Sequence, residues 1–198
     1  FYVKIRNFLE VYQRGLVEFN DEKKEWEKVA QFGEQWLEVS DSHTFLYTEN
    51  GTEYVYFADP YPLVRVKADP EQLRSPANFE SFTPLKRGSR LDRIELDRDD
   101  NGKLRYAWKA DTPPLGPKEQ ARLIKDGLMR AEEAVMRLED ADTGKAILAH
   151  RGSVYRNDYR KRWIMIFVES GGTSFLGEVW YAEAETPLGP WVWAKKIV

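Results

Sequence analysis

The chain has 198 residues, which is enough for one domain with a substantial hydrophobic core. Its 30 basic and 33 acidic side chains give a formal charge of −3. This balance argues against a general nucleic-acid-binding protein, because such a protein needs a basic surface to displace counterions. No apolar run approaches the ~20 residues that span a bilayer, so we expect no membrane partner.

Cysteine is absent, which excludes disulfides, zinc–thiolate sites and thiol nucleophiles. This absence does not fix the compartment, and a secreted or periplasmic location is compatible with it. The chain begins at Phe1 without an initiator methionine. We therefore expect a processed or trimmed polypeptide.

Two hairpins are predicted in the first third of the chain. Strand-like runs at 16–19 and 26–29 flank a polar turn, Asn20 to Lys24. Aromatic and β-branched runs at 43–47 and 53–58 flank Asn50-Gly51, the strongest short hairpin signal. A further strand is predicted at 63–66.

The middle of the chain is less regular. Region 69–90 contains three prolines and few periodic apolar residues, so we expect a connection there. Runs at 91–96 and 103–108 flank an Asp-Asp-Asn-Gly turn, which predicts a third hairpin. Residues 118–138 have apolar side chains at helical spacing after Pro117, which predicts a short helical insertion divided at Gly127. Such an insertion is more simply a packing helix than a regulatory element.

Strands resume after residue 144. The run at 150–155, the most apolar run at 163–168, and the runs at 178–182 and 191–197 predict antiparallel pairing. An aromatic strand followed by an acidic-Thr-Pro turn and Gly-Pro occurs twice, at 106–117 and 180–191. Recurring strand-and-turn units indicate a repeat architecture built from small sheets. The two histidines of the chain, His43 and His150, begin equivalent runs in two such units.

With these histidines, the Asn50-Gly51 hairpin, the run His150-Arg151-Gly152-Ser153 and the turn at 186–191, the chain resembles the five-bladed β-propeller glycoside hydrolases. That group includes the family 43 arabinofuranosidases and xylosidases and the family 32 fructosidases. The closest resemblance is to bacterial propeller proteins related to it. The resemblance covers roughly residues 12–198 and implies an all-β fold of four-stranded blades around a channel.

A blade needs about 40–50 residues, so residues 1–198 hold about three to four blades of one propeller domain. The resemblance then implies that the remaining blades belong to a larger chain. It also implies that His43 and His150 begin innermost strands and face the channel. In that position they would hold a water, an anion or a metal, or would simply be hydrogen-bonded structural groups. Two histidines without an acidic cluster predict no metal site, and no cofactor is expected.

The resemblance implies that carboxylates hydrolyse a glycosidic bond of an oligo- or polysaccharide, one as general acid and one as base. Glu169 is the candidate acid, because it ends the most apolar strand and precedes a Gly-rich loop. Glu178, on the returning strand, is expected beside it. The alternative is that both carboxylates cap strand ends or pair with arginines.

The base and the sugar-binding groups are less clearly marked. Asp59 and Asp92 are the candidate bases, although Asp59-Pro60 also reads as an ordinary turn. Arg151 and Ser153 are expected to contact sugar hydroxyls, unless they form a solvated strand end. The aromatic content of 14% suits either sugar stacking or a β-rich core, and Trp180 and Tyr181 read as core.

The sequence therefore predicts a carbohydrate-active β-propeller that is a glycoside hydrolase relative. One alternative is a non-catalytic propeller that binds a glycan or another protein. Another is a structural fragment without a ligand. Fold analogy carries much of this prediction, and a fold does not by itself establish a function.

Overall fold

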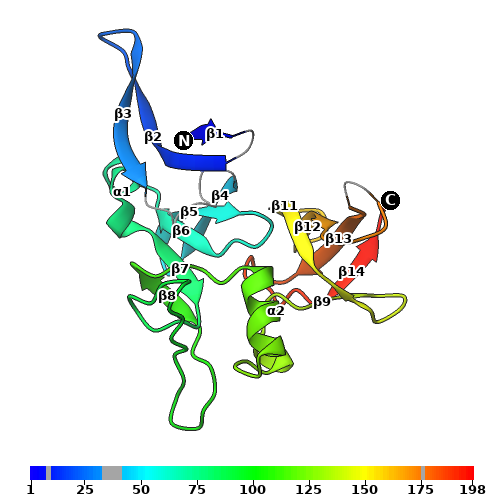
Figure 1. Ribbon diagram of the computed structural model, residues 1–198. Coiled ribbons are helices and arrows are strands. Elements are labelled where there is room, and N and C mark those ends of the chain that lie inside the picture. Colours follow the sequence, from blue (N-terminus) through cyan, green and yellow to red (C-terminus); the bar gives the residue numbers. More distant parts are fainter. Residues whose placement is uncertain (8–9, 33–41, 175–176) are drawn as a thin grey trace.

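The computed structural model describes residues 1–7, 10–32, 42–174 and 177–198. These residues form a predominantly β structure of three antiparallel-rich sheets, with a helix α2 below them (Figure 1). The expected all-β class is confirmed. Among the described residues, no helix is long and apolar enough to cross a membrane.

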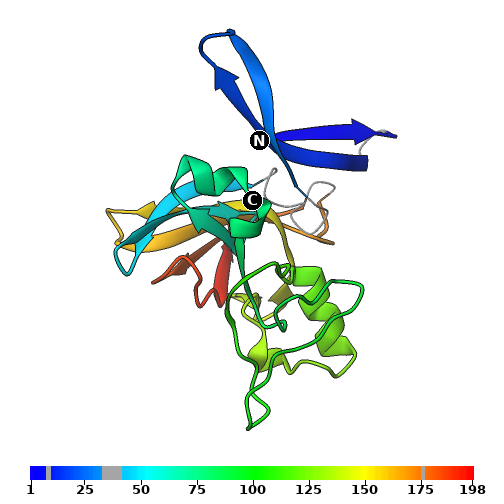
Figure 2. The same ribbon diagram turned by 90° about the vertical axis from the view of Figure 1, so that its left-hand side faces the viewer.

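The first sheet projects away from the body of the molecule (Figure 2). Its order is β1-β2-β3, with β1 at Tyr2–Arg6, β2 at Glu10–Asn20 and β3 at Glu25–Phe32. The first predicted hairpin is confirmed by β2 and β3. Its turn forms because the Asn20 side-chain oxygen accepts hydrogen bonds from the backbone N–H groups of Glu22 and Lys23. The sheet is anchored at Phe32, whose ring packs 5.3 Å from that of Phe79.

The second sheet has the order β4-β5-β6-β7-β8. Its strands are β4 His43–Glu49, β5 Thr52–Ala58, β6 Val64–Lys67, β7 Glu80–Thr83 and β8 Ala107–Ala110. The hairpin at Asn50-Gly51 is confirmed. Both turn residues have positive φ, 48° and 78°, as a two-residue turn compatible with strand twist requires.

Two expectations for the middle region are wrong. Region 69–90 is not a plain connection, because it contains α1 Pro70–Arg74, the 3₁₀ turn η3 Pro76–Asn78 and strand β7. The third predicted hairpin is reduced to single-residue bridges, such as Arg98 with Leu104. Strand β8 pairs with β7 instead, which brings the Trp108 ring to 5.5 Å from that of Phe82. Burial of aromatic surface against β7 outweighs the local turn signal.

The third sheet has the order β10-β9-β14-β13-β12-β11. Its strands are β9 Leu138–Asp140, β10 Ala146–Ile147, β11 Ala149–Asn157, β12 Arg162–Glu169, β13 Val179–Ala184 and β14 Trp193–Lys196. The predicted antiparallel run from β11 to β14 is confirmed. The short strands β9 and β10 are not predicted by the sequence, and β9 joins β14 in parallel.

The helical insertion is shorter than the predicted range. Helix α2 spans Pro117–Lys125 and begins at the predicted proline, and a 3₁₀ turn, η4, follows at Ala131–Glu133. Gly127, with φ of +71°, separates them as expected. Leu123 and Met129 pack into a small core with Leu85, so the insertion serves as a packing element.

The second and third sheets share the main hydrophobic core. The Trp163 ring of β12 lies 4.9 Å from that of Phe45 and 5.4 Å from that of Tyr47, both on β4. Strands β4 and β11, each at an edge of its own sheet, lie next to each other. Burial of this shared face therefore fixes how the two sheets meet.

The two copies of the acidic-Thr-Pro turn occupy different places in their sheets. Strand β8 ends at Ala110 before the first copy and is followed by helix α2, whereas β13 ends at Ala184 before the second and is followed by β14. β8 is an edge strand, and β13 lies inside its sheet. The repeated motif therefore marks the end of a strand and the turn after it, and not an equivalent position in a sheet, because turn formation depends on neighbouring residues.

Candidate functional site

Most of the candidate residues lie at one end of the second and third sheets. His43 begins β4 and pairs with Ala58, so Asp59 follows at the same end. Ala149 pairs with Glu169, which places His150 there too. The sheet-end cluster, as we call it, comprises His43, Asp59, His150, Arg151, Ser153, Glu169 and Glu178.

An ion pair joins the two sheets within this cluster. The Arg151 guanidinium on β11 donates to the Asp59 carboxylate that follows β5, and the Gly152 N–H donates to the other Asp59 oxygen at 3.2 Å. The Asp59 side chain is 8% exposed and that of Arg151 is 54% exposed. The aspartate is therefore held in place, while the arginine still faces solvent.

Gly152 allows this close approach. A Cβ atom at this position would lie 2.4 Å from the Ile166 carbonyl oxygen and 2.7 Å from the Phe167 Cβ on β12. Any side chain would therefore push β11 away from β12. Gly152 thus helps to place the Arg151 side chain and its own backbone N–H against Asp59.

The candidate acid Glu169 ends β12, as predicted. Its Oε2 accepts a hydrogen bond from Trp180 Nε1 at 3.0 Å. No ion pair reaches Glu169 from the part of the chain that the structure describes. Trp180 is buried, as expected for a core residue, but its indole N–H also orients this carboxylate.

Glu178 lies beside Glu169, as expected, because the Glu169 N–H donates to the Glu178 carbonyl oxygen at 2.9 Å. Its carboxylate Oε1 accepts from the Thr173 hydroxyl at 2.5 Å and from the Thr173 N–H at 3.0 Å. The Lys196 ammonium lies 3.6 Å away. The two Thr173 donors lower the pKa of Glu178 to about 2. Glu178 is therefore ionised at neutral pH and unsuited to donate a proton.

The remaining predicted residues have fewer contacts. His43 and His150 are exposed, and Ser153 is half-buried. Among the described residues, no group of three or more histidine, aspartate or glutamate side chains is placed to hold a metal ion. Asp92, the second candidate base, is exposed in the loop between β7 and β8 and lies outside the cluster.

Sequence reasoning missed the groups that hold the carboxylates. Thr173 fixes Glu178 from within the Gly-rich loop, and Trp180 fixes Glu169 from the neighbouring strand. The only sequence signal for these groups was the loop itself, which carries a hydroxyl five residues before a glutamate. Comparison with known proteins identifies no relative: no family model, no curated protein and no solved structure matches this chain.

Proposed function

We propose that this chain is a carbohydrate-active protein of the β-propeller type, which recognises a saccharide at the sheet-end cluster. The observation that carries the proposal is the ion pair between Arg151 and Asp59. It brings the ends of two sheets together and gathers carboxylates, a guanidinium and imidazoles in one region. Bidentate donors and carboxylate acceptors of this kind are what sugar hydroxyls require.

The first form of the proposed activity is hydrolysis of the bound saccharide. Glu169 is the proton donor, because within the described residues its carboxylate is held only by the neutral Trp180 N–H and not by a cation. Asp59 is the base that activates water, with Arg151 fixing its orientation. Glu178 has no proton to give and takes the role of an anchor for the Gly-rich loop.

Glycan binding without hydrolysis is the second form, and a specific observation favours it. Asp59 and Glu178 are both held by several donors, as structural carboxylates are. In this form the cluster recognises the sugar, and no proton transfer follows.

The outer face of the third sheet supports the proposed propeller, in which sheets pack face to face around a channel. This face exposes Tyr155, Ile166 and Trp193, which are 49%, 37% and 57% exposed. The opposite face of the same sheet is covered by the second sheet. We propose that a further sheet of the parent protein covers the outer face, and repeating the same packing in this way generates a propeller.

The decisive experiment combines hydrolysis and binding. Wild type is incubated with aryl α-L-arabinofuranosides, β-D-xylosides and neutral oligosaccharides, and binding to the oligosaccharides is measured by calorimetry. Glu169→Gln should lower hydrolysis by about 10²–10⁴-fold, as removal of a general acid does, while binding persists. The matched control is Glu185→Gln, an exposed carboxylate that pairs with Arg162.

The outcomes separate the two forms. Binding by wild type without turnover assigns the chain to the binding form. Turnover that Glu169→Gln leaves unchanged removes Glu169 as the acid. If wild type neither binds nor hydrolyses any saccharide on the panel, the proposed function is wrong.

A further inference from the structure

A cavity lies between the second and third sheets, at the other end of β13 from the sheet-end cluster. We call it the connector cleft, because it is bordered by segments 103–106, 130–139 and 188–192, which connect the sheets. Strand β13 runs from Val179, next to Glu178, to Ala184, just before the turn that borders the cleft. Six strand residues span about 20 Å, so the two regions are distinct.

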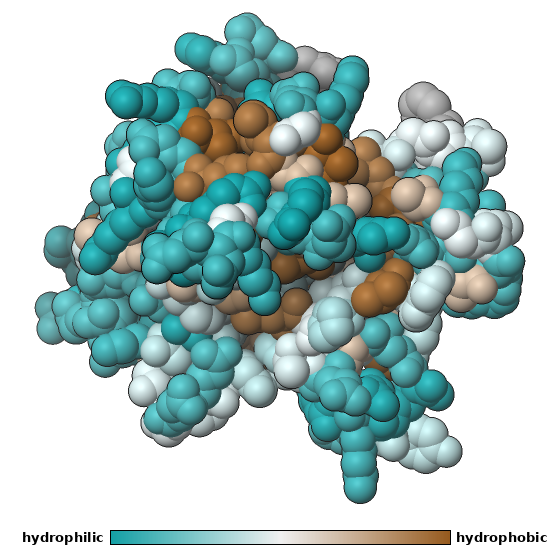
Figure 3. Space-filling model, turned by 90° about the horizontal axis from the view of Figure 1, so that it is seen from below, coloured by the Kyte–Doolittle hydropathy of each residue, from teal (hydrophilic) through white to brown (hydrophobic). Residues whose placement is uncertain are grey.

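The cleft has the size and lining of a small-molecule site. Its volume is about 820 Å³, within the usual range for ligand sites. Seen from below, the surface is hollowed in its middle, with hydrophobic residues inside and hydrophilic residues around (Figure 3).

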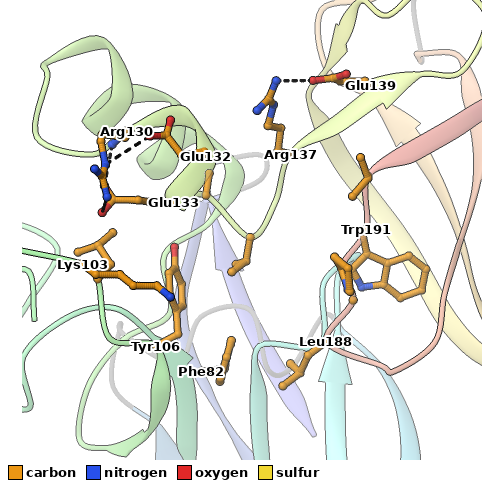
Figure 4. Close-up of a pocket in the computed structure, with 16 residues that line it drawn as sticks. Phe82, Lys103, Tyr106, Arg130, Glu132, Glu133, Arg137, Glu139, Leu188 and Trp191 are labelled. Carbon is orange, nitrogen blue, oxygen red and sulfur yellow. Dashed lines mark hydrogen bonds and ion pairs between the residues drawn. The ribbon is translucent and has the colours of Figure 1, made fainter. Parts of the chain in front are cut away.

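One wall of the cleft is aromatic. The Tyr106 and Phe82 rings stack at 5.6 Å, and Leu188 and Trp191 lie across from them (Figure 4). Burial raises the pKa of Tyr106, so its hydroxyl stays protonated at neutral pH. The Val135 backbone N–H lies within hydrogen-bonding reach of the Tyr106 oxygen, and no described side chain accepts the hydroxyl proton, which leaves that proton to bond a ligand hydroxyl.

The side chains that line the cleft include three basic and three acidic groups, and Arg98, which lies outside the lining, pairs with Glu133 and leaves one positive charge in excess. The three carboxylates of this rim are all paired: Glu133 with Arg98 at 2.9 Å and Arg130 at 3.0 Å, Glu132 with Arg130 at 3.4 Å, and Glu139 with Arg137 at 2.6 Å. Three arginines balance these three carboxylates. Lys103, which also lines the cleft, forms no ion pair with any described residue. One positive charge is left for a ligand.

We propose that the connector cleft binds an acidic sugar residue, such as a uronic acid unit of a polysaccharide. The apolar C–H face of the ring lies on the aromatic wall, and its carboxylate pairs with Lys103. Its hydroxyls bond Tyr106 and the rim carboxylates. An aryl carboxylate would use the wall and Lys103 but has no hydroxyl groups to bond Tyr106 and the rim, so the mixed polar rim favours a sugar.

The test uses calorimetry on the whole chain with three probes: a galacturonate trisaccharide, the neutral galactose trisaccharide and benzoate. The acidic trisaccharide should bind at least about tenfold more tightly than the neutral one, since a hydrogen bond to a charged group is worth that much or more. Lys103→Gln should abolish this preference. Tyr106→Phe should weaken the binding of both sugars. The matched control is Lys118→Gln, an exposed lysine on α2 that does not line the cleft.

Several results would overturn the proposal. They are the absence of binding at millimolar concentration, equal affinity for the two trisaccharides, affinity for benzoate as high as for the acidic sugar, and an equal effect of Lys118→Gln. Loss of acidic-sugar binding in Glu169→Gln but not in Lys103→Gln would move the ligand to the sheet-end cluster. That last result would contradict the connector-cleft proposal but not the proposed function of the sheet-end cluster. Conversely, if neutral saccharides neither bind nor are hydrolysed at the sheet-end cluster, the connector-cleft proposal is unaffected.

Discussion

Arg65 offers the sharpest test of how the second sheet is held together. Its side chain is 9% exposed, and its guanidinium lies 4.0 Å from the ring centroids of both Tyr54 and Trp108. The same group pairs with Glu49 and with Glu80, the latter at 3.0 Å. One planar cation thus binds two rings and two carboxylates drawn from the four strands β4, β5, β7 and β8.

Replacement by methionine keeps the apolar stem and removes the charge. Breaking a buried ion pair by removing one partner costs about 3–5 kcal/mol. The low end applies here, because the Glu49 and Glu80 side chains are 27% and 32% exposed and regain water. The two cation–π contacts contribute about 0.5–2 kcal/mol each and are part of that cost. We therefore expect Arg65→Met to lower the free energy of unfolding by about 3 kcal/mol.

Urea unfolding followed by tryptophan fluorescence measures this effect. For a chain of this length, the loss corresponds to a fall of about 6–12 °C in Tm. The matched control is Arg162→Met, which removes an exposed pair with Glu185 and should cost at most about 0.5 kcal/mol. If Arg65→Met were no more destabilising than Arg162→Met, the reasoning about this cation would be refuted.

Three further predictions concern the core and the sheet-end cluster. Trp163→Ala should lower the free energy of unfolding in urea by about 3–5 kcal/mol, because this side chain is 5% exposed and joins the two sheets. The control is Trp26→Ala, which should be nearly neutral because Trp26 is 69% exposed. Similar losses in both variants would contradict the shared core. Gly152→Ala should cost about 1–3 kcal/mol, because its Cβ would meet the Ile166 carbonyl oxygen, and unchanged stability would show that β11 has room to move. The pKa of Glu178 is lowered from 4.5 to about 2, so its ionised form stabilises the fold above pH 4.5 and this stability is lost as the pH falls toward 2. Glu178→Gln should therefore be less stable than wild type at pH 7 but not near pH 2, and a gap independent of pH would count against the Thr173 contacts.

The candidate site was predictable in its members but not in its arrangement. Strand ends and a Gly-rich loop singled out Glu169, Glu178 and Asp59 from the sequence. Their partners come from elsewhere: Arg151 lies 92 residues after Asp59, and Trp180 lies on the strand next to Glu169. No local pattern encodes such contacts, because they depend on which sheet edges meet.

By itself, the sequence determined the elements whose formation is a local matter. The Asn50-Gly51 turn, the apolar run of β12 and the helix start at Pro117 all follow from backbone preferences and side-chain periodicity within a few residues. Only the tertiary structure decided that β8 pairs with β7, that β9 runs parallel to β14, and that Arg151 reaches Asp59. Those contacts form because burial of aromatic faces between sheets is worth more than any one turn, and the free energy of burial depends on surfaces that no single segment contains.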